Sequence, residues 1–185
     1  MAPSPIKVYQ IKVTLRRSRP AIWRRFEILS HTKLGRVHRI LQIVMGWTNS
    51  HLHHFVVGEN CYGAPHPDVT FHGEKDERRV RLDEVLRSPK NRIRYEYGFS
   101  DGWVHDVVLE RIRERDRNER YPVILDAQGA CPPEAVGGID GYYEFLEAVV
   151  NPRHRAHKRT REWWGGPFDP REYDIEEHNK ALPRR

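Results

Sequence analysis

The sequence predicts an α+β fold with a β-grasp-like mixed sheet, in which a hairpin, a crossing helix and a further hairpin precede a C-terminal helical tail. Three observations lead to this class: two pairs of extended segments, a helically spaced apolar segment between them, and repeated helix signals near the end. The length of 185 residues suits one domain over residues 1–185. We expect a sheet core at 6–139 and a helical tail at 140–185 packed on it.

The first elements are a hairpin and a helix. Residues 6–16 alternate apolar and polar side chains, and residues 22–29 resume an extended pattern after Pro20, which is typical of two paired strands. Thr32 is the predicted N-cap of the helix that follows, and Gly46 is its predicted end. The apolar residues of this helix follow a 3.6-residue spacing: Leu34, Val37, Leu41 and Val44.

The middle of the chain predicts three more strands. Residues 51–57 read as a strand, and residues 59–79 are rich in Gly, Pro, His and charge, which favours a loop. Residues 82–87 predict a short helix. Two further strands, 93–99 and 103–112, flank a tight turn and indicate a second hairpin.

The last third predicts helices after an irregular stretch. Residues 126–141 are rich in Gly and Pro, so we expect no regular structure there. Asp140 is a predicted cap for a helix to Val150, and a basic helix follows to Trp164. A final helix begins at Asp174 and ends near Leu182.

The charge of the chain is unevenly distributed. The net charge is +6, but residues 1–58 hold ten Lys or Arg and one acid, whereas residues 59–151 hold thirteen bases and nineteen acids. A basic surface attracts nucleic acid or another polyanion, and the simpler alternative is a solvated face. Arg24 alternates with apolar residues, so we expect it to point inward and pair with an acid. The candidates for nucleic-acid contact are Arg16, Arg17, Arg19, Arg25, Lys33, Arg36 and Arg39.

Several classes of protein are excluded by composition. No apolar run approaches the length of about 18 residues that a membrane span needs. The alternating start of the chain is not a signal peptide, and two Cys do not make a disulfide scaffold. We therefore expect a cytoplasmic protein without membrane association.

A second group of candidates carries acid–base or metal chemistry. His51 and His53 share one face if they lie on a strand, and Asp101 and His105 flank the turn of the second hairpin. Glu134 lies in the irregular stretch. These five residues are the candidate catalytic groups, and His51, His53 and His105 are the candidate ligands of a divalent metal. The alternative is structural: histidines packed on a sheet face, Asp101 forming the turn, and Glu134 following a Pro-Pro brace.

The chain resembles the plasmid pRiA4b ORF-3-like family in several segments that occur in the family's order. They are IWRR at 22–25, MGWTNSHLHHF at 45–55, SDGWVH at 100–105, YP at 121–122, GACPPE at 129–134, GGIDGYYEFLEA at 137–148 and FDPREYD at 168–174. The resemblance implies an α+β fold and a plasmid or mobile-element setting. It implies no established biochemical activity.

The chain also departs from the pattern of this family. The family's usual turn motif begins with an acid, where this chain has Gly98, and the second acid of the motif is kept as Asp101. Many members carry Cys near 123–124 and 135–136, where this chain has Val-Ile and Ala-Val, so only Cys131 remains of a cysteine cluster. Because a structural zinc site needs four ligands, we do not expect a thiolate zinc site.

Two hypotheses for function follow. The first is a non-enzymatic binding module that contacts nucleic acid or a protein partner through its basic N-terminal third. The second is a small metal-assisted or His/Asp acid–base hydrolase built on the five candidate residues. The sequence does not specify the substrate, the metal, or the oligomeric state.

Overall fold

The computed structural model describes residues 5–65 and 74–183 of the chain. Its eight strands are β1 (Lys7–Leu15), β2 (Trp23–Leu29), β3 (His53–Val57), β4 (Asn60–Gly63), β5 (Lys75–Asp76), β6 (Arg92–Tyr97), β7 (Trp103–Glu114) and β8 (Val123–Gln128). Its helices are α1 (Leu34–Met45), α2 (Leu82–Val85), α3 (Gly138–Val150), α4 (His157–Trp164) and α5 (Ile175–Ala181), with a 3₁₀ turn, η1, at Glu77–Arg79.

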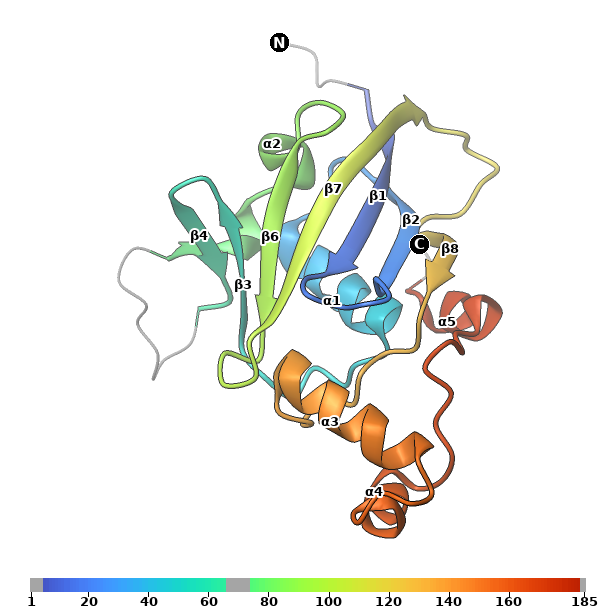
Figure 1. Ribbon diagram of the computed structural model, residues 1–185. Coiled ribbons are helices and arrows are strands. Elements are labelled where there is room, and N and C mark those ends of the chain that lie inside the picture. Colours follow the sequence, from blue (N-terminus) through green and yellow to red (C-terminus); the bar gives the residue numbers. More distant parts are fainter. Residues whose placement is uncertain (1–4, 66–73, 184–185) are drawn as a thin grey trace.

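All eight strands belong to one sheet in the order β5-β4-β3-β6-β7-β1-β2-β8 (Figure 1). Only the β4–β5 pair is parallel within the described residues. The hairpins β1–β2 and β6–β7 meet side by side, because β1 also pairs with β7. This arrangement confirms the predicted α+β class, with a mixed sheet and C-terminal helices.

Helix α1 covers one face of the sheet (Figure 1). Its buried residues include the four apolar positions predicted from the spacing, together with His38 and Gln42. The N-cap is Lys33 and not Thr32 as predicted, because the Thr32 hydroxyl donates to the carbonyl of Leu29 at 2.6 Å. Gly46 ends the helix as predicted, in the left-handed conformation that glycine adopts without strain.

Two stretches predicted to be irregular contain strands, and these predictions are wrong in part. The expected loop at 59–79 includes β4, β5 and η1, while its residues 66–73 lie outside the described part. The stretch at 126–141 contains the end of β8 and the start of α3 at Gly138. Strand β4 forms by pairing with β3, β5 by pairing with β4, and β8 by pairing with β2, and local periodicity does not reveal such pairing.

The C-terminal tail packs on the same core as the sheet. Helix α3 lies below the sheet in Figure 1, and α5 lies beside β8. The side chain of Asn179 in α5 bonds both the N–H and the C=O of Ile124, so α5 covers the free edge of β8. Asp174 caps α5 as predicted, whereas the N-cap of α3 is Gly137 and not Asp140. No helix in the described ranges has the length and apolar character needed to cross a bilayer.

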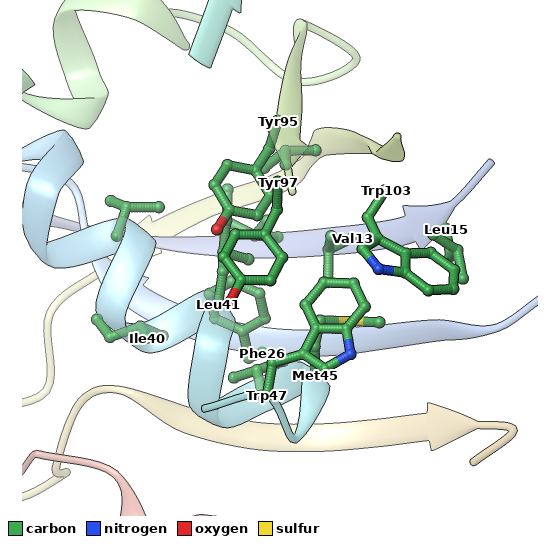
Figure 2. Packing of buried hydrophobic residues seen from close by; sticks show 14 of the residues in the cluster. Val13, Leu15, Phe26, Ile40, Leu41, Met45, Trp47, Tyr95, Tyr97 and Trp103 are labelled. Atoms are coloured by element: carbon green, nitrogen blue, oxygen red, sulfur yellow. The ribbon is translucent and has the colours of Figure 1, made fainter. Parts of the chain in front are cut away.

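The core lies between α1 and the sheet and is rich in aromatic rings (Figure 2). The ring of Trp47 stacks on that of Tyr97 at 5.1 Å between centroids and lies 5.5 Å from Trp103. Tyr95 and Tyr97 are both fully buried on β6. These rings form a rigid support beneath the segment 48–53 that enters β3.

Arg24 is the buried cation of the core. It points inward as predicted, but no acid among the described residues pairs with it. Its guanidinium donates to the carbonyls of Val44, Trp23 and Gln128 at 2.9–3.1 Å and stacks on the ring of Tyr173. Arg24 therefore ties α1, β2 and β8 together.

Candidate functional site

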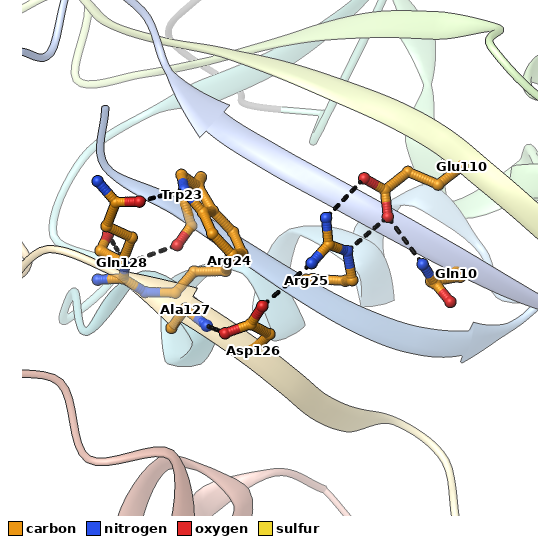
Figure 3. Close-up of polar contacts among 8 residues, drawn as sticks. All are labelled: Gln10, Trp23, Arg24, Arg25, Glu110, Asp126, Ala127 and Gln128. Atoms are coloured by element: carbon orange, nitrogen blue, oxygen red, sulfur yellow. Dashed lines mark hydrogen bonds and ion pairs between the residues drawn. The ribbon is translucent and has the colours of Figure 1, made fainter. Parts of the chain in front are cut away.

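The predicted basic residues divide into three groups, and the first lies on the sheet face opposite α1. There Arg16 binds both carboxylate oxygens of Asp106 at 2.7 and 2.9 Å. Arg25 bonds Glu110 at 2.7 and 3.1 Å and Asp126 at 3.1 Å (Figure 3). The acids of the middle segment therefore neutralise these cations across neighbouring strands.

Arg17 and Arg19 connect the β1–β2 loop to α3. The guanidinium of Arg17 pairs with Asp140 at 2.7 Å. The backbone N–H of Arg19 donates to the hydroxyl of Tyr143 at 2.6 Å. Both contacts position this loop against the tail, and the ion pair with Asp140 offsets the charge of Arg17.

The third group surrounds a pocket of about 580 Å³ between the start of α1 and the segment that enters β3. We call it the α1–β3 pocket. Arg36 and Arg39 contribute to it from α1, Lys33 from the N-cap of α1, and Arg78 from η1. Lys33 and Arg39 are exposed, Arg36 donates to the carbonyl of Pro183, and Arg78 pairs with Asp76. Three of the seven predicted basic residues thus line one cavity.

Two stacked imidazole rings line the same pocket. The rings of His38 and His53 lie 3.4 Å apart between centroids and are parallel within 1°. His53 Nε2 donates to Glu77 Oε2 at 2.8 Å, and the Glu77 side chain is only 5% exposed. The carboxylate therefore fixes the orientation of the His53 ring.

A hydrogen-bond network holds His38 in its neutral form. His38 Nε2 donates to Asn49 Oδ1 at 2.7 Å, which leaves Nδ1 to accept from the hydroxyl of Tyr95 at 2.8 Å. That hydroxyl accepts from Gln42 Nε2, and Gln42 Oε1 accepts from the N–H of Asn49. Burial, and then the charge of a protonated His53, lower the pKa of His38 to about 3. His38 is therefore an uncharged surface on which His53 stacks.

The structure places two of the five predicted catalytic residues in the α1–β3 pocket, His51 and His53. His105 lies elsewhere, fully buried in the core with Trp47 packed edge-on at 5.2 Å. Its Nδ1 donates weakly to the carbonyl of Tyr95 at 3.4 Å, and burial lowers its pKa to about 4. His105 is a core residue.

Glu134 and Asp101 also lie away from the pocket's imidazoles. Glu134 accepts from the N–H and hydroxyl of Thr48, from the N–H of Ser50 and from the hydroxyl of Tyr97. Burial opposes ionisation of Glu134, but these hydrogen bonds outweigh it and lower the pKa of the carboxyl. Asp101 forms the turn between β6 and β7, and its carbonyl lies so close to Gly138 that a Cβ there would be 2.1 Å away.

The proposed metal ligands do not converge. Across residues 5–65 and 74–183, no group of three or more His, Cys, Asp or Glu side chains is placed to hold a metal ion. Of the three candidates, His53 already bonds Glu77, His105 is in the core, and only His51 shares a cavity with His53.

Sequence reasoning missed His38, Asn49 and Glu77. His38 lies one residue from Val37 and four from Leu34, so it falls on the apolar side of a predicted amphipathic helix. A polar residue at that position was the available signal. Glu77 carried no comparable signal in the sequence, because it lies in a charged stretch predicted to be a loop.

The chain is similar to proteins found in bacteria and archaea. The family model described as plasmid pRiA4b ORF-3-like protein matches residues 7–177. The uncharacterized protein y4hQ of Sinorhizobium fredii (strain NBRC 101917 / NGR234) is 39% identical over 177 residues, covering 95% of this chain and 90% of the relative. The crystal structure of MM3350, a protein of unknown function from Methanosarcina mazei Go1, superposes with a TM-score of 0.84 at 30% identity. That match covers 94% of this chain and 98% of MM3350.

Proposed function

The chain belongs to the plasmid pRiA4b ORF-3-like family, and we propose that it binds nucleic acid by holding backbone phosphates at the rim of the α1–β3 pocket. Neither relative has an assigned function, so similarity identifies the family and no activity. The observation that carries the proposal is that Lys33, Arg36 and Arg39 lie around one cavity, with Lys33 and Arg39 exposed.

The spacing of these cations favours a run of phosphates over a single one. Lys33, Arg36 and Arg39 recur every third residue and so lie along one side of α1. At a rise of about 1.5 Å per residue, the row extends about 9 Å along the helix axis. A polyanion with regularly spaced phosphates matches such a row, and contacts of this kind position a nucleic acid without reading its bases.

The cations on the opposite sheet face are less available to a phosphate than the exposed Lys33 and Arg39. Arg16 and Arg25 lie there, and each is bonded to carboxylates of neighbouring strands. A phosphate would have to displace those carboxylates, which costs the ion pairs already formed. Of the two partner classes predicted from the sequence, nucleic acid is favoured over an acidic protein by the regular spacing of the α1 cations.

Fluorescence anisotropy with labelled single-stranded DNA and RNA tests the proposal. The variant is Lys33→Gln with Arg39→Gln, because these exposed side chains are not needed for the helix. The matched control is Arg16→Gln with Arg25→Gln. It also removes two cations predicted to contact nucleic acid, but from the sheet face opposite α1. We expect the α1 variant to bind about tenfold more weakly, with a salt slope reduced by about 1.4 for two lost phosphate contacts.

The control variant is expected to bind like the unmodified protein. Equal loss in both variants would contradict the proposal, because it would indicate diffuse attraction by net charge. Absence of binding to either nucleic acid at low salt would overturn it.

A further inference from the structure

The imidazole of His53 lines the α1–β3 pocket, and Glu77 fixes one of its ring nitrogens. Because a carboxylate only accepts, Nε2 of His53 carries the proton that bonds Glu77. Neutral His53 then has a free electron pair on Nδ1, and no described residue bonds that nitrogen. A carboxylate that fixes one imidazole nitrogen and leaves the other available is the arrangement of a general base.

The neighbouring His38 is not available for proton transfer. Both of its nitrogens are engaged, with Asn49 and with Tyr95, and its pKa is lowered to about 3. Its role is to support the His53 ring from one side. His53 is therefore held by stacking on one face and by Glu77 at one edge, which leaves little freedom to the ring.

His51 is the second imidazole available in the pocket. It lies in the bend before β3 and is only partly buried. Its backbone N–H donates to the hydroxyl of Tyr97, which in turn donates to Glu134. The ring of His51 meets that of Tyr97 nearly edge-on at 5.6 Å. Tyr97 and Glu134 thus position the segment that carries His51.

We propose that the α1–β3 pocket cleaves RNA, with His53 as general base and His51 as general acid. This inference rests on the proposed function, since the strand must first be held by its phosphates. The residues fit RNA in particular because its ribose 2′-OH is an internal nucleophile. Such a reaction needs from the protein a base, an acid and positive charge, and the pocket holds all three.

Cleavage transfers the phosphoryl group from the 5′ oxygen to the 2′ oxygen. Nδ1 of His53 takes the 2′-OH proton while the 2′ oxygen forms a bond to phosphorus. The bond from phosphorus to the 5′ oxygen breaks, and that oxygen takes a proton from protonated His51. The products are a 2′,3′-cyclic phosphate and a free 5′-OH, and proton exchange with water restores both histidines. Lys33, Arg36 and Arg39 would stabilise the negative charge that builds up on the phosphoryl oxygens.

The first experiment compares three oligonucleotides of one sequence: RNA, 2′-O-methyl RNA and DNA. We expect all three to bind and RNA alone to be cleaved, with a 2′,3′-cyclic phosphate identified by mass spectrometry. Binding of all three without cleavage would overturn this inference and leave the proposed function standing. Cleavage of the 2′-O-methyl strand would also overturn it, because that strand has no 2′ nucleophile.

Variants then assign the roles. His53→Gln and His51→Gln are each expected to slow RNA cleavage by about 10²- to 10⁴-fold while RNA affinity is unchanged. The matched control is His54→Gln, since His54 lies on the same strand but bonds Glu96 on the opposite sheet face. Equal cleavage by unmodified protein and His53→Gln would identify a contaminating nuclease and overturn the inference.

A substrate with an activated leaving group separates the acid from the base. Uridine 3′-(p-nitrophenyl phosphate) releases p-nitrophenolate, which leaves without a proton. The His51→Gln variant should therefore cleave it nearly as fast as the unmodified protein, whereas His53→Gln should remain slow. A slow His51→Gln variant on this substrate would contradict the role of general acid.

Discussion

The carboxylate of Glu77 lies against the first turn of α1 at the point where Gly35 has no side chain. A Cβ at position 35 would lie 2.9 Å from Glu77 Oε1, closer than carbon and oxygen tolerate. Glu77 is nearly fully buried there and reaches His53. The glycine therefore admits the carboxylate that orients the pocket's imidazole.

Gly35→Ala should disturb the pocket more than the fold. Alanine favours the helix by about 0.5–1 kcal/mol, and this gain offsets part of the cost of displacing Glu77. We expect a free energy of unfolding within about 1 kcal/mol of the unmodified protein. The Nε2 proton of His53, visible by NMR when bonded to Glu77, should be lost. Retention of that proton signal would show that Glu77 is not displaced.

The lowered pKa of His105 predicts that mild acidification destabilises the folded protein. Its pKa is about 4 in the folded protein against an ordinary 6.5, so the unfolded chain binds its proton first. Stability should therefore fall as the pH drops from 6.5 to 4, by about 2 kcal/mol at pH 5 from this residue alone. Urea unfolding at both ends of this range measures it. His105→Phe should show a shallower decline, and an equal decline in both proteins would contradict the assignment.

The Arg25–Glu110 ion pair should stabilise the sheet and take no part in nucleic-acid binding. Both side chains are about one quarter exposed, and the guanidinium bonds both carboxylate oxygens. A double-mutant cycle with Arg25→Gln and Glu110→Gln should give a coupling energy of about 1 kcal/mol, at the upper end for partly exposed pairs. A coupling near zero would show that the pair adds nothing in solution.

Chelation should not affect RNA cleavage by the pocket. His53 Nε2 bonds Glu77, both nitrogens of His38 are engaged, and the described residues hold no three-ligand cluster. Cleavage rates with and without EDTA should therefore agree. Loss of cleavage on chelation, restored by a divalent metal, would favour the metal-assisted alternative.

The sequence predicted the elements whose residues carry their own periodic pattern. The alternation in β1 and the helical spacing in α1 were sufficient, because the buried face of each is visible within one segment. Strands β4, β5 and β8 were missed because they are two to six residues long and depend on a neighbour for pairing.

The candidate site was predicted only in part. His51 and His53 were found because they are close in sequence, but Glu77 and His38 reach them through tertiary packing. The segregation of charge was also partly misinterpreted. The excess of bases near the N-terminus and of acids in the middle reflects in part pairs between neighbouring strands, such as Arg16 with Asp106.

Chemical-shift mapping tests the central claim, that the α1–β3 pocket binds nucleic acid, most directly. The titrant is a 2′-O-methyl RNA oligonucleotide, which binds without being cleaved. The claim predicts that the largest amide shift changes occur at residues 33–39 and 49–53, with little change at Arg16 and Arg25. Shift changes centred on Arg16 and Arg25, or none at all, would contradict it.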